Sequence, residues 1–177
     1  MFKVRMLALA AVGACLMANA QAQQNLYGGV TLSMINYEEE GFPSVNPTAL
    51  GIKLGSKFHP NLAAEVRLGI GASSDSVTFE GLPVDIEVDN YVGAYLKGLV
   101  PLSPVVSVYG LVGYTRGEIT ASVLGFSASD SDSDVSIGLG IEVDVANNVQ
   151  LGIEWARLFD GPGYTVNAIT GALNFKF

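Results

Sequence analysis

The stretch that decides the fold is the C-terminal segment, residues 163–177, which reads GYTVNAITGALNFKF. Apolar residues or glycine occupy every second position back from the terminus, namely Phe177, Phe175, Leu173, Gly171 and Ile169. Polar or small residues fill the positions between them, namely Lys176, Asn174, Ala172 and Thr170. Because successive side chains of a β-strand point to opposite faces, this alternation predicts a strand with one apolar and one polar face.

The composition of the whole chain narrows the class of protein. The 177 residues fit a single domain, and 49% of them are hydrophobic while 15% are charged. Soluble domains usually carry about 25% charged residues, so this chemistry is typical of a membrane protein. Beyond the N-terminal segment, however, the sequence has no apolar run of about 18 residues that could form a spanning helix. We therefore expect glycine-rich strands and tight turns.

The N-terminal segment has the features of a cleaved signal peptide. Lys3 and Arg5 form a basic end, residues 6–18 are mostly apolar, and Ala20-Gln21-Ala22 is a small-x-small cleavage site. We expect residues 1–22 to be removed on export and residues 23–177 to form the mature domain. That domain keeps 7 basic and 17 acidic side chains, a net charge of −10.

Cys15 is the single cysteine, and it falls inside the apolar part of the signal peptide. The mature chain therefore has no disulfide. Val12-Gly13-Ala14-Cys15 also resembles a lipoprotein signal, and lipidation at Cys15 is the alternative to cleavage after Ala22.

Alternation like that of the C-terminal segment recurs along the chain and predicts eight strands. The other seven fall at residues 25–36, 48–58, 62–72, 86–100, 105–118, 135–145 and 149–159. The pattern leaves open which face of residues 105–118 is apolar. The connections alternate between long and short, and the long ones are acidic loops at residues 37–47, 73–85, 119–134 and 160–163. Because residues 119–134 contain the sequence SASDSDSD, we expect a mobile loop there.

An even number of strands of about 10 residues, with turns at one end and loops at the other, is typical of a transmembrane barrel. Over nearly all of the mature chain the sequence resembles the small outer-membrane β-barrel family that includes the OmpA membrane domain and OmpX. The resemblance implies an all-β, eight-stranded, antiparallel up-and-down barrel, monomeric in the outer membrane of a Gram-negative bacterium. It implies contacts with outer-membrane lipids and lipopolysaccharide. It also implies that Phe175 and Phe177 form a signal read by the barrel-assembly machinery.

The charged faces of the strands are also their glycine-rich faces, and we expect them to point into the barrel. A small lumen has room only for side chains, and opposite charges enclosed there can pair. The predicted interior ionic network comprises Lys53, Glu65, Arg67, Lys97, Glu142 and Glu154. The opposite faces are almost uncharged, as contact with lipid requires, with Arg157 the exception near a strand end. A soluble barrel, with its apolar face inside, is the alternative.

Few side chains here are suited to catalysis or to metal binding. His59 is the single histidine and lies in a short turn, so no Ser/His/Asp set can form. We therefore predict no enzymatic activity and no cofactor. Asp130, Asp132 and Asp134 are candidates for a divalent-cation site shared with lipopolysaccharide, and a solvated acidic loop is the alternative. An EF-hand starting at Asp130 is excluded, since Val135 and Ile141 replace the required Gly and Glu.

The sequence thus favours a structural or surface-interaction role through acidic extracellular loops that contact an unknown ligand. Acidic loops disfavour nucleic acid as a partner. The alternative function is a narrow porin-like channel for small solutes.

Overall fold

The computed structural model describes residues 25–41, 43–79, 82–123 and 126–177, so the predicted signal peptide lies outside the described residues. None of the described residues forms a helix long and apolar enough to cross a membrane. The described chain forms β1 (Leu26–Glu39), β2 (Thr48–His59), β3 (Leu62–Ser73), β4 (Asp75–Phe79), β5 (Leu82–Pro101), β6 (Val106–Val123), β7 (Phe126–Ala146), β8 (Val149–Gly161) and β9 (Tyr164–Lys176).

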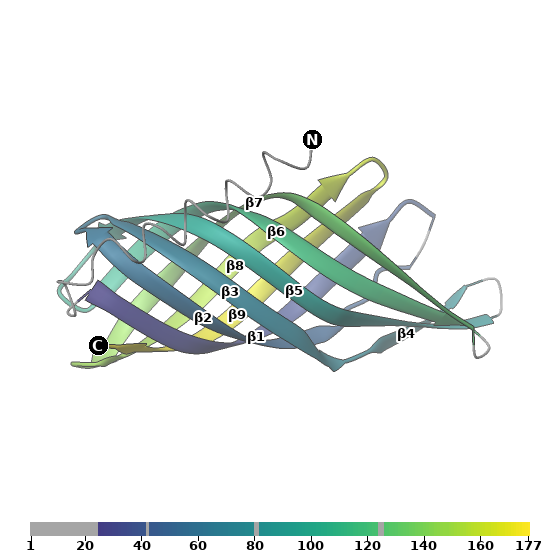
Figure 1. The fold of residues 1–177 in the computed structure, drawn as a ribbon, viewed down its shortest axis with the longest axis horizontal. Coiled ribbons are helices and arrows are strands. Elements are labelled where there is room, and N and C mark those ends of the chain that lie inside the picture. The colour runs from purple at the N-terminus through teal and green to yellow at the C-terminus, as the bar shows by residue number, and fades with distance from the viewer. Residues whose placement is uncertain (1–24, 42, 80–81, 124–125) are drawn as a thin grey trace.

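The strands close into a barrel (Figure 1). Neighbouring strands are antiparallel in the order β3-β2-β1-β9-β8-β7-β6-β5, and β5 pairs back to β3. The short β4 continues β3 beyond a break at Ser74 and pairs with the beginning of β5. The ring therefore has eight positions, which confirms the predicted eight-stranded up-and-down barrel. Closure leaves no unpaired edge where all eight described strands pair around the ring, as a medium without water requires.

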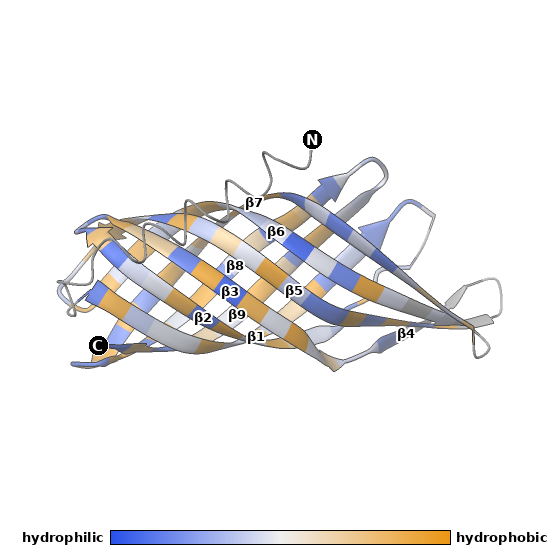
Figure 2. Cartoon of the chain, in the orientation of Figure 1, coloured by the Kyte–Doolittle hydropathy of each residue, from blue (hydrophilic) through white to orange (hydrophobic). Residues whose placement is uncertain are grey.

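Alternation along each strand sends apolar side chains outward and polar side chains inward. On β1, for example, Leu32 and Met34 are exposed while Thr31 and Ser33 are buried. In Figure 2 the hydrophobic positions gather along the central part of the barrel. An exposed apolar belt around a polar interior is the arrangement that lipid favours, so the soluble-barrel alternative is wrong.

The two ends of the barrel differ. We call one the turn end, where short turns join β2 to β3, β5 to β6 and β7 to β8, and where the C-terminus lies (Figure 1). The other is the loop end. There β5, β6 and β7, with 20, 18 and 21 residues, rise above strands of 12 to 14 residues. The β7–β8 pairing begins only at Ile137, so among the described strands β6 alone pairs with the outer part of β7.

Two of the predicted loops are strands instead. In residues 119–134, predicted to be a mobile loop, β7 pairs with β6 from Phe126 onward. Cross-strand hydroxyl pairs, Thr120–Ser129 at 2.7 Å and Ser122–Ser127 at 2.9 Å, add to this ladder. Residues 73–85 contain β4 and the beginning of β5. Serine and aspartate favour loops in isolation, but here pairing with the neighbouring strand overrides that preference.

Two β-bulges reverse the predicted facing of several residues. In β5 the register with β6 shifts between Val88 and Asn90, which leaves Asp89 as an extra residue. Val88 therefore points inward and is 6% exposed, whereas unbroken alternation along residues 86–100 would place Val88 outside, with Glu87 and Asp89 inside. A shift between Arg157 and Phe159 in β8 likewise turns Phe159 inward, where it is 8% exposed.

The facing of residues 105–118, which the sequence left open, follows from β6. Tyr109, Leu111 and Thr115 are buried in the interior, and Val112 between them is exposed. Three inward tyrosines, Tyr27, Tyr95 and Tyr109, pack with Leu99 and Leu111 on the turn side of the lumen. Their rings fit because glycine faces them. A Cβ atom at residue 55 would lie 2.2 Å from the ring of Tyr27.

Candidate functional site

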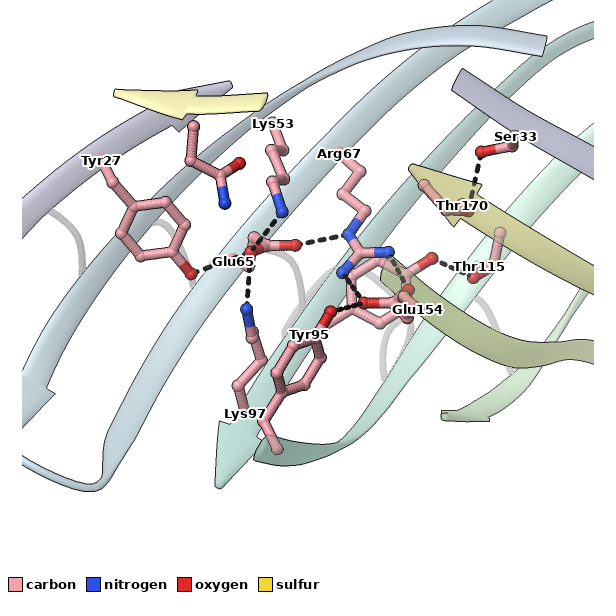
Figure 3. Close-up of polar contacts among 12 residues, drawn as sticks. Tyr27, Ser33, Lys53, Glu65, Arg67, Tyr95, Lys97, Thr115, Glu154 and Thr170 are labelled. Carbon is pink, nitrogen blue, oxygen red and sulfur yellow. Dashed lines mark hydrogen bonds and ion pairs between the residues drawn. The ribbon is translucent and has the colours of Figure 1, made fainter. Parts of the chain in front are cut away.

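The interior contains a buried ionic network centred on Glu65 of β3, which is 0% exposed (Figure 3). Its carboxylate accepts hydrogen bonds from the hydroxyl of Tyr27 at 2.8 Å and from Nε of Arg67 at 2.5 Å. The ammonium groups of Lys53 and Lys97 lie 3.7 and 3.6 Å from its Oε2. Glu65 thus joins side chains from four strands, β1, β2, β3 and β5.

Arg67 extends the network across the lumen to β8, which lies on the far side of the ring from β3. Its two terminal nitrogens donate to the Glu154 oxygens at 2.5 and 2.7 Å, a bidentate pair (Figure 3). The hydroxyl of Tyr109 donates to the same carboxylate at 2.7 Å. The guanidinium also lies 4.5 Å from the centre of the Tyr95 ring. A planar cation held on both sides makes this cross-lumen contact rigid.

Lys97 of β5 completes the network by pairing with Glu142 of β7. Its ammonium also lies 3.8 Å from the centre of the Tyr109 ring. The structure thus brings together all six residues predicted for the interior, three cations and three anions: Lys53, Arg67, Lys97, Glu65, Glu142 and Glu154. Mutual pairing offsets the cost of removing these charges from water. The arrangement fills the lumen on the turn side.

A layer of hydroxyl groups lies above the ionic network. The hydroxyl of Thr115 is 2.6 Å from that of Tyr95 and 2.6 Å from that of Ser136. Ser33 and Thr170 form a second pair at 2.9 Å (Figure 3). These hydrogen bonds satisfy buried hydroxyl groups halfway along the lumen. Between them and the loop end the lumen is lined mainly by apolar side chains.

Toward the loop end the lumen opens into a cavity of about 560 Å³, which we call the mouth cavity. Its wall is mainly apolar and includes Ile35, Ile86, Val88, Phe159 and Val166. Its rim carries three carboxylates, Glu39, Asp130 and Asp132, and the paired rings of Tyr37 and Tyr164. Those ring centres are 6.0 Å apart, with planes 20° from parallel. This hollow was not predicted, since two wall residues, Val88 and Phe159, point inward only because of bulges.

The three aspartates proposed for a cation site lie along β7. Asp132 accepts a hydrogen bond from Tyr164, and Asp134 accepts one from the backbone N–H of Asp160 at 2.9 Å. Burial, followed by this bond to Asp132, raises the pKa of Tyr164 to about 12. Alternate residues of a strand are about 6.6 Å apart, which spreads the carboxylates along the strand instead of converging them. Within the described ranges, no group of three or more His, Cys, Asp or Glu side chains could hold a metal ion.

The remaining candidates lie at the turn end. His59 is exposed where β2 turns into β3, and its Nδ1 accepts a hydrogen bond from the N–H of Asn61 at 3.2 Å. Phe175 and Phe177 are exposed where β9 ends, and the Phe177 N–H donates to the carbonyl of Leu26 at 2.9 Å. The reading of these two aromatic residues by the assembly machinery stays a prediction.

Three tyrosines, Tyr27, Tyr95 and Tyr109, take part in the network although the pattern of charged residues did not indicate them. The hydroxyls of Tyr27 and Tyr109 hydrogen-bond to buried glutamates, and the ring of Tyr95 stacks on Arg67. The sequence does contain a sign of their inward position. They lie in strands rich in glycine, and a large side chain in a narrow lumen needs a small residue opposite it on the neighbouring strand.

Known proteins share this barrel architecture. The family model described as "Outer membrane protein beta-barrel domain" matches residues 6–177. A search of curated protein sequences finds no match.

Several solved structures share the fold. Ail, the attachment invasion locus protein of Yersinia pestis, is 17% identical with a TM-score of 0.64, and the match covers 87% of this chain and 99% of that chain. Neisserial surface protein A is 12% identical with a TM-score of 0.66, covering 86% and 97%. The N-terminal β-barrel domain of Pseudomonas aeruginosa OprF is 12% identical with a TM-score of 0.56, covering 86% and 98%. At these identities the likeness concerns the fold.

Proposed function

Because the chain belongs to the outer-membrane β-barrel family and lies in the outer membrane, we propose that it is a non-catalytic surface protein whose loop end makes contacts outside the cell. The apolar belt anchors the barrel among membrane lipids, and we propose that lipopolysaccharide surrounds its outer half. The ionic network gives the barrel its rigidity. The raised strands β5, β6 and β7 present the contact surface.

The observation that carries this proposal is the bidentate Arg67–Glu154 pair across the lumen. A side-chain bridge between strands on opposite sides of the ring leaves little room for solute on the turn side. The mouth cavity at the loop end is an open concave surface of the lumen. Contact there, without passage through the wall, is the function that this division of the lumen supports best.

The charge of the loop end indicates the kind of partner. The loop end is mainly acidic, because its acidic residues outnumber its two arginines, Arg116 and Arg157. In the described part of the chain the acidic residues are Glu38, Glu39, Glu40, Asp75, Asp85, Glu87, Asp89, Glu118, Asp130, Asp132, Asp134 and Asp160. Ail of Yersinia pestis has been crystallised with the heparin analogue sucrose octasulfate, a polyanion. The loop end described here has the opposite charge preference, so we propose cationic partners for it.

Cysteine labelling on intact cells tests the orientation. Ser44→Cys places a thiol at the exposed loop end, and Asn148→Cys places one in an exposed turn at the other end. A membrane-impermeant maleimide should label Ser44→Cys and spare Asn148→Cys until the cells are broken. If intact cells label only Asn148→Cys, the turn end faces the outside, and the proposed contact surface is wrong.

Conductance measurements test the competing function, a narrow pore. Purified protein in a planar bilayer should give no steady conductance, since the ionic network crosses the lumen. The double variant Arg67→Ala/Glu154→Ala, which removes the cross-lumen pair without leaving a lone charge, should raise the conductance if the pair is the barrier. Steady conductance from the unmodified protein would favour the pore.

A further inference from the structure

The mouth cavity has the size and depth of a ligand site. Its volume of about 560 Å³ falls within the range of roughly 300–1,000 Å³ typical of sites for small molecules. Thr115 lies at its base and is tied to Tyr95 and Ser136 through hydroxyl contacts. Because the Arg67–Glu154 pair fills the lumen below that layer, the cavity is closed at its inner end and open toward the loop end.

The wall of the cavity suits an apolar body. Ile35 of β1, Phe159 of β8 and Val166 of β9 belong to one buried cluster, and Val88 of β5 faces them in the same cluster. These inward apolar residues lie at the end of the barrel where membrane contact does not explain them. When an apolar ligand displaces water from a concave apolar surface, the free energy of binding becomes more favourable.

The rim of the cavity suits a positive charge. Three carboxylates line it, those of Glu39, Asp130 and Asp132, and the lining residues include no Lys, Arg or His within the described chain. The Tyr37 hydroxyl donates to Glu39 at 2.8 Å, and the Tyr164 hydroxyl donates to Asp132. These bonds fix the two rings beside the carboxylates, and aromatic faces attract cations as well.

We propose that the mouth cavity binds a small organic cation with an apolar body, such as an arylalkyl ammonium. The apolar body lies against Phe159 and Val88, and the ammonium group lies at the rim between the carboxylates of β1 and β7. This assignment deepens the proposed surface role and rests on it only for the side from which the ligand arrives.

Three matched probes test the assignment on the folded protein in lipid nanodiscs, with empty nanodiscs as the blank. Phenylbutylammonium, phenylbutanol and phenylbutyrate share one aryl body and differ in head group and charge. Calorimetry should show that the ammonium binds about fivefold more tightly than the alcohol, as one partly screened charge contact allows, and that the carboxylate binds least. Added salt should shrink the ammonium preference and leave the alcohol unchanged.

Charge variants localise the preference. Asp130→Asn/Asp132→Asn removes two rim charges with little change of shape, so the ammonium should bind no better than the alcohol. The matched control Asp85→Asn/Glu87→Gln removes two charges from the exposed face of β5, outside the cavity lining, and should keep the preference. Equal effects of the two double variants would show that the net charge of the loop end, and not the rim, attracts the cation, and would overturn the assignment.

Filling the cavity tests the apolar part. Val88→Phe should weaken all three probes, and Val166→Phe, from another strand, provides a second variant if the first does not fold. Folding is checked by heat-modifiable gel mobility. Equal binding of the three probes, tightest binding of phenylbutyrate, or no binding by folded protein would each overturn the assignment. None of these results depends on orientation, so reversed cysteine labelling would instead defeat the proposed function and leave the cavity assignment standing.

Discussion

The inner face of the barrel holds two regions of opposite character. On the turn side it carries charges, and these are paired, nearly inaccessible to water and packed against tyrosine rings. On the loop side it carries isoleucine, valine and phenylalanine, and there the lumen is hollow. The charged region is thus the filled one, and the apolar region is the open one. In this narrow barrel the paired charges close the lumen to solutes. The inward apolar residues beyond the membrane belt surround the space that is open to a ligand.

The largest expected effect comes from breaking the charged region at its centre. Glu65→Gln removes the anion that Lys53, Arg67 and Lys97 share, and leaves buried cations undercompensated. We expect the free energy of unfolding to fall by about 3–5 kcal/mol. Denaturant unfolding in lipid vesicles measures it.

The control for Glu65→Gln is Asp144→Asn, which breaks a pair with Lys176 at the turn end. There the N–O distance is 2.6 Å and both side chains are 29% exposed. The loss should stay below about 1 kcal/mol. Comparable losses from the two variants would mean that burial does not make the interior network special.

Truncation of apolar side chains sharpens the contrast between a filled and a hollow region. Leu99 packs in the turn-side cluster with Tyr27 and Tyr109, so Leu99→Ala creates a cavity and should cost about 2–5 kcal/mol. Ile35 lines a cavity that already exists, so Ile35→Ala should cost about 1–2 kcal/mol. Unfolding in the same vesicles compares them. A larger loss for Ile35→Ala would indicate that the loop-side lumen is packed.

A glycine substitution tests the bulge that forms one wall of the mouth cavity. A Cβ atom at residue 71 would lie 1.9 Å from the backbone oxygen of Val88, so Gly71→Ala must displace the bulge. We expect a loss of about 1–3 kcal/mol together with weaker probe binding. At Gly98 a Cβ atom meets nothing within 4 Å, and Gly98→Ala should stay within about 0.5 kcal/mol. Unchanged probe binding by Gly71→Ala would separate the bulge from the cavity.

The smallest expected effect concerns the rim at high pH. Tyr164 has a pKa of about 12, raised by burial and by its bond to Asp132, against about 10 for an ordinary tyrosine. Its contribution to stability is therefore complete below pH 10 and is lost as the pH rises through 12. Difference spectra of tyrosinate between the unmodified protein and Tyr164→Phe should show one ionisation near pH 12. Asp132→Asn should lower that pKa, and an unchanged value would remove Asp132 as a cause.

Most of the barrel could be predicted from the sequence, but little of the mouth cavity could be. Strict alternation in β1, β2 and β7 predicts strands whose facing the structure keeps, and charges such as Lys53 and Glu65 reveal the inward face because lipid excludes them. A bulge leaves no such mark, since the extra residue at Asp89 is set by how β6 pairs with β5. The hairpin of β6 and β7 was missed because Ser and Asp favour loops on their own.

The outer part of β7 pairs with β6 on one side, and its pairing with β8 starts only at Ile137. Within the part of the chain that the structure describes, it therefore presents a free strand edge, the kind of surface along which a second copy could add its own strand. Asp130, Asp132 and Asp134 lie beside that edge, on the lumen face of the same segment, so the like charges of two copies repel each other before their backbones can meet. The acidic repeat would then keep neighbouring barrels apart in a crowded membrane, and a divalent salt that bridges carboxylates should make them associate.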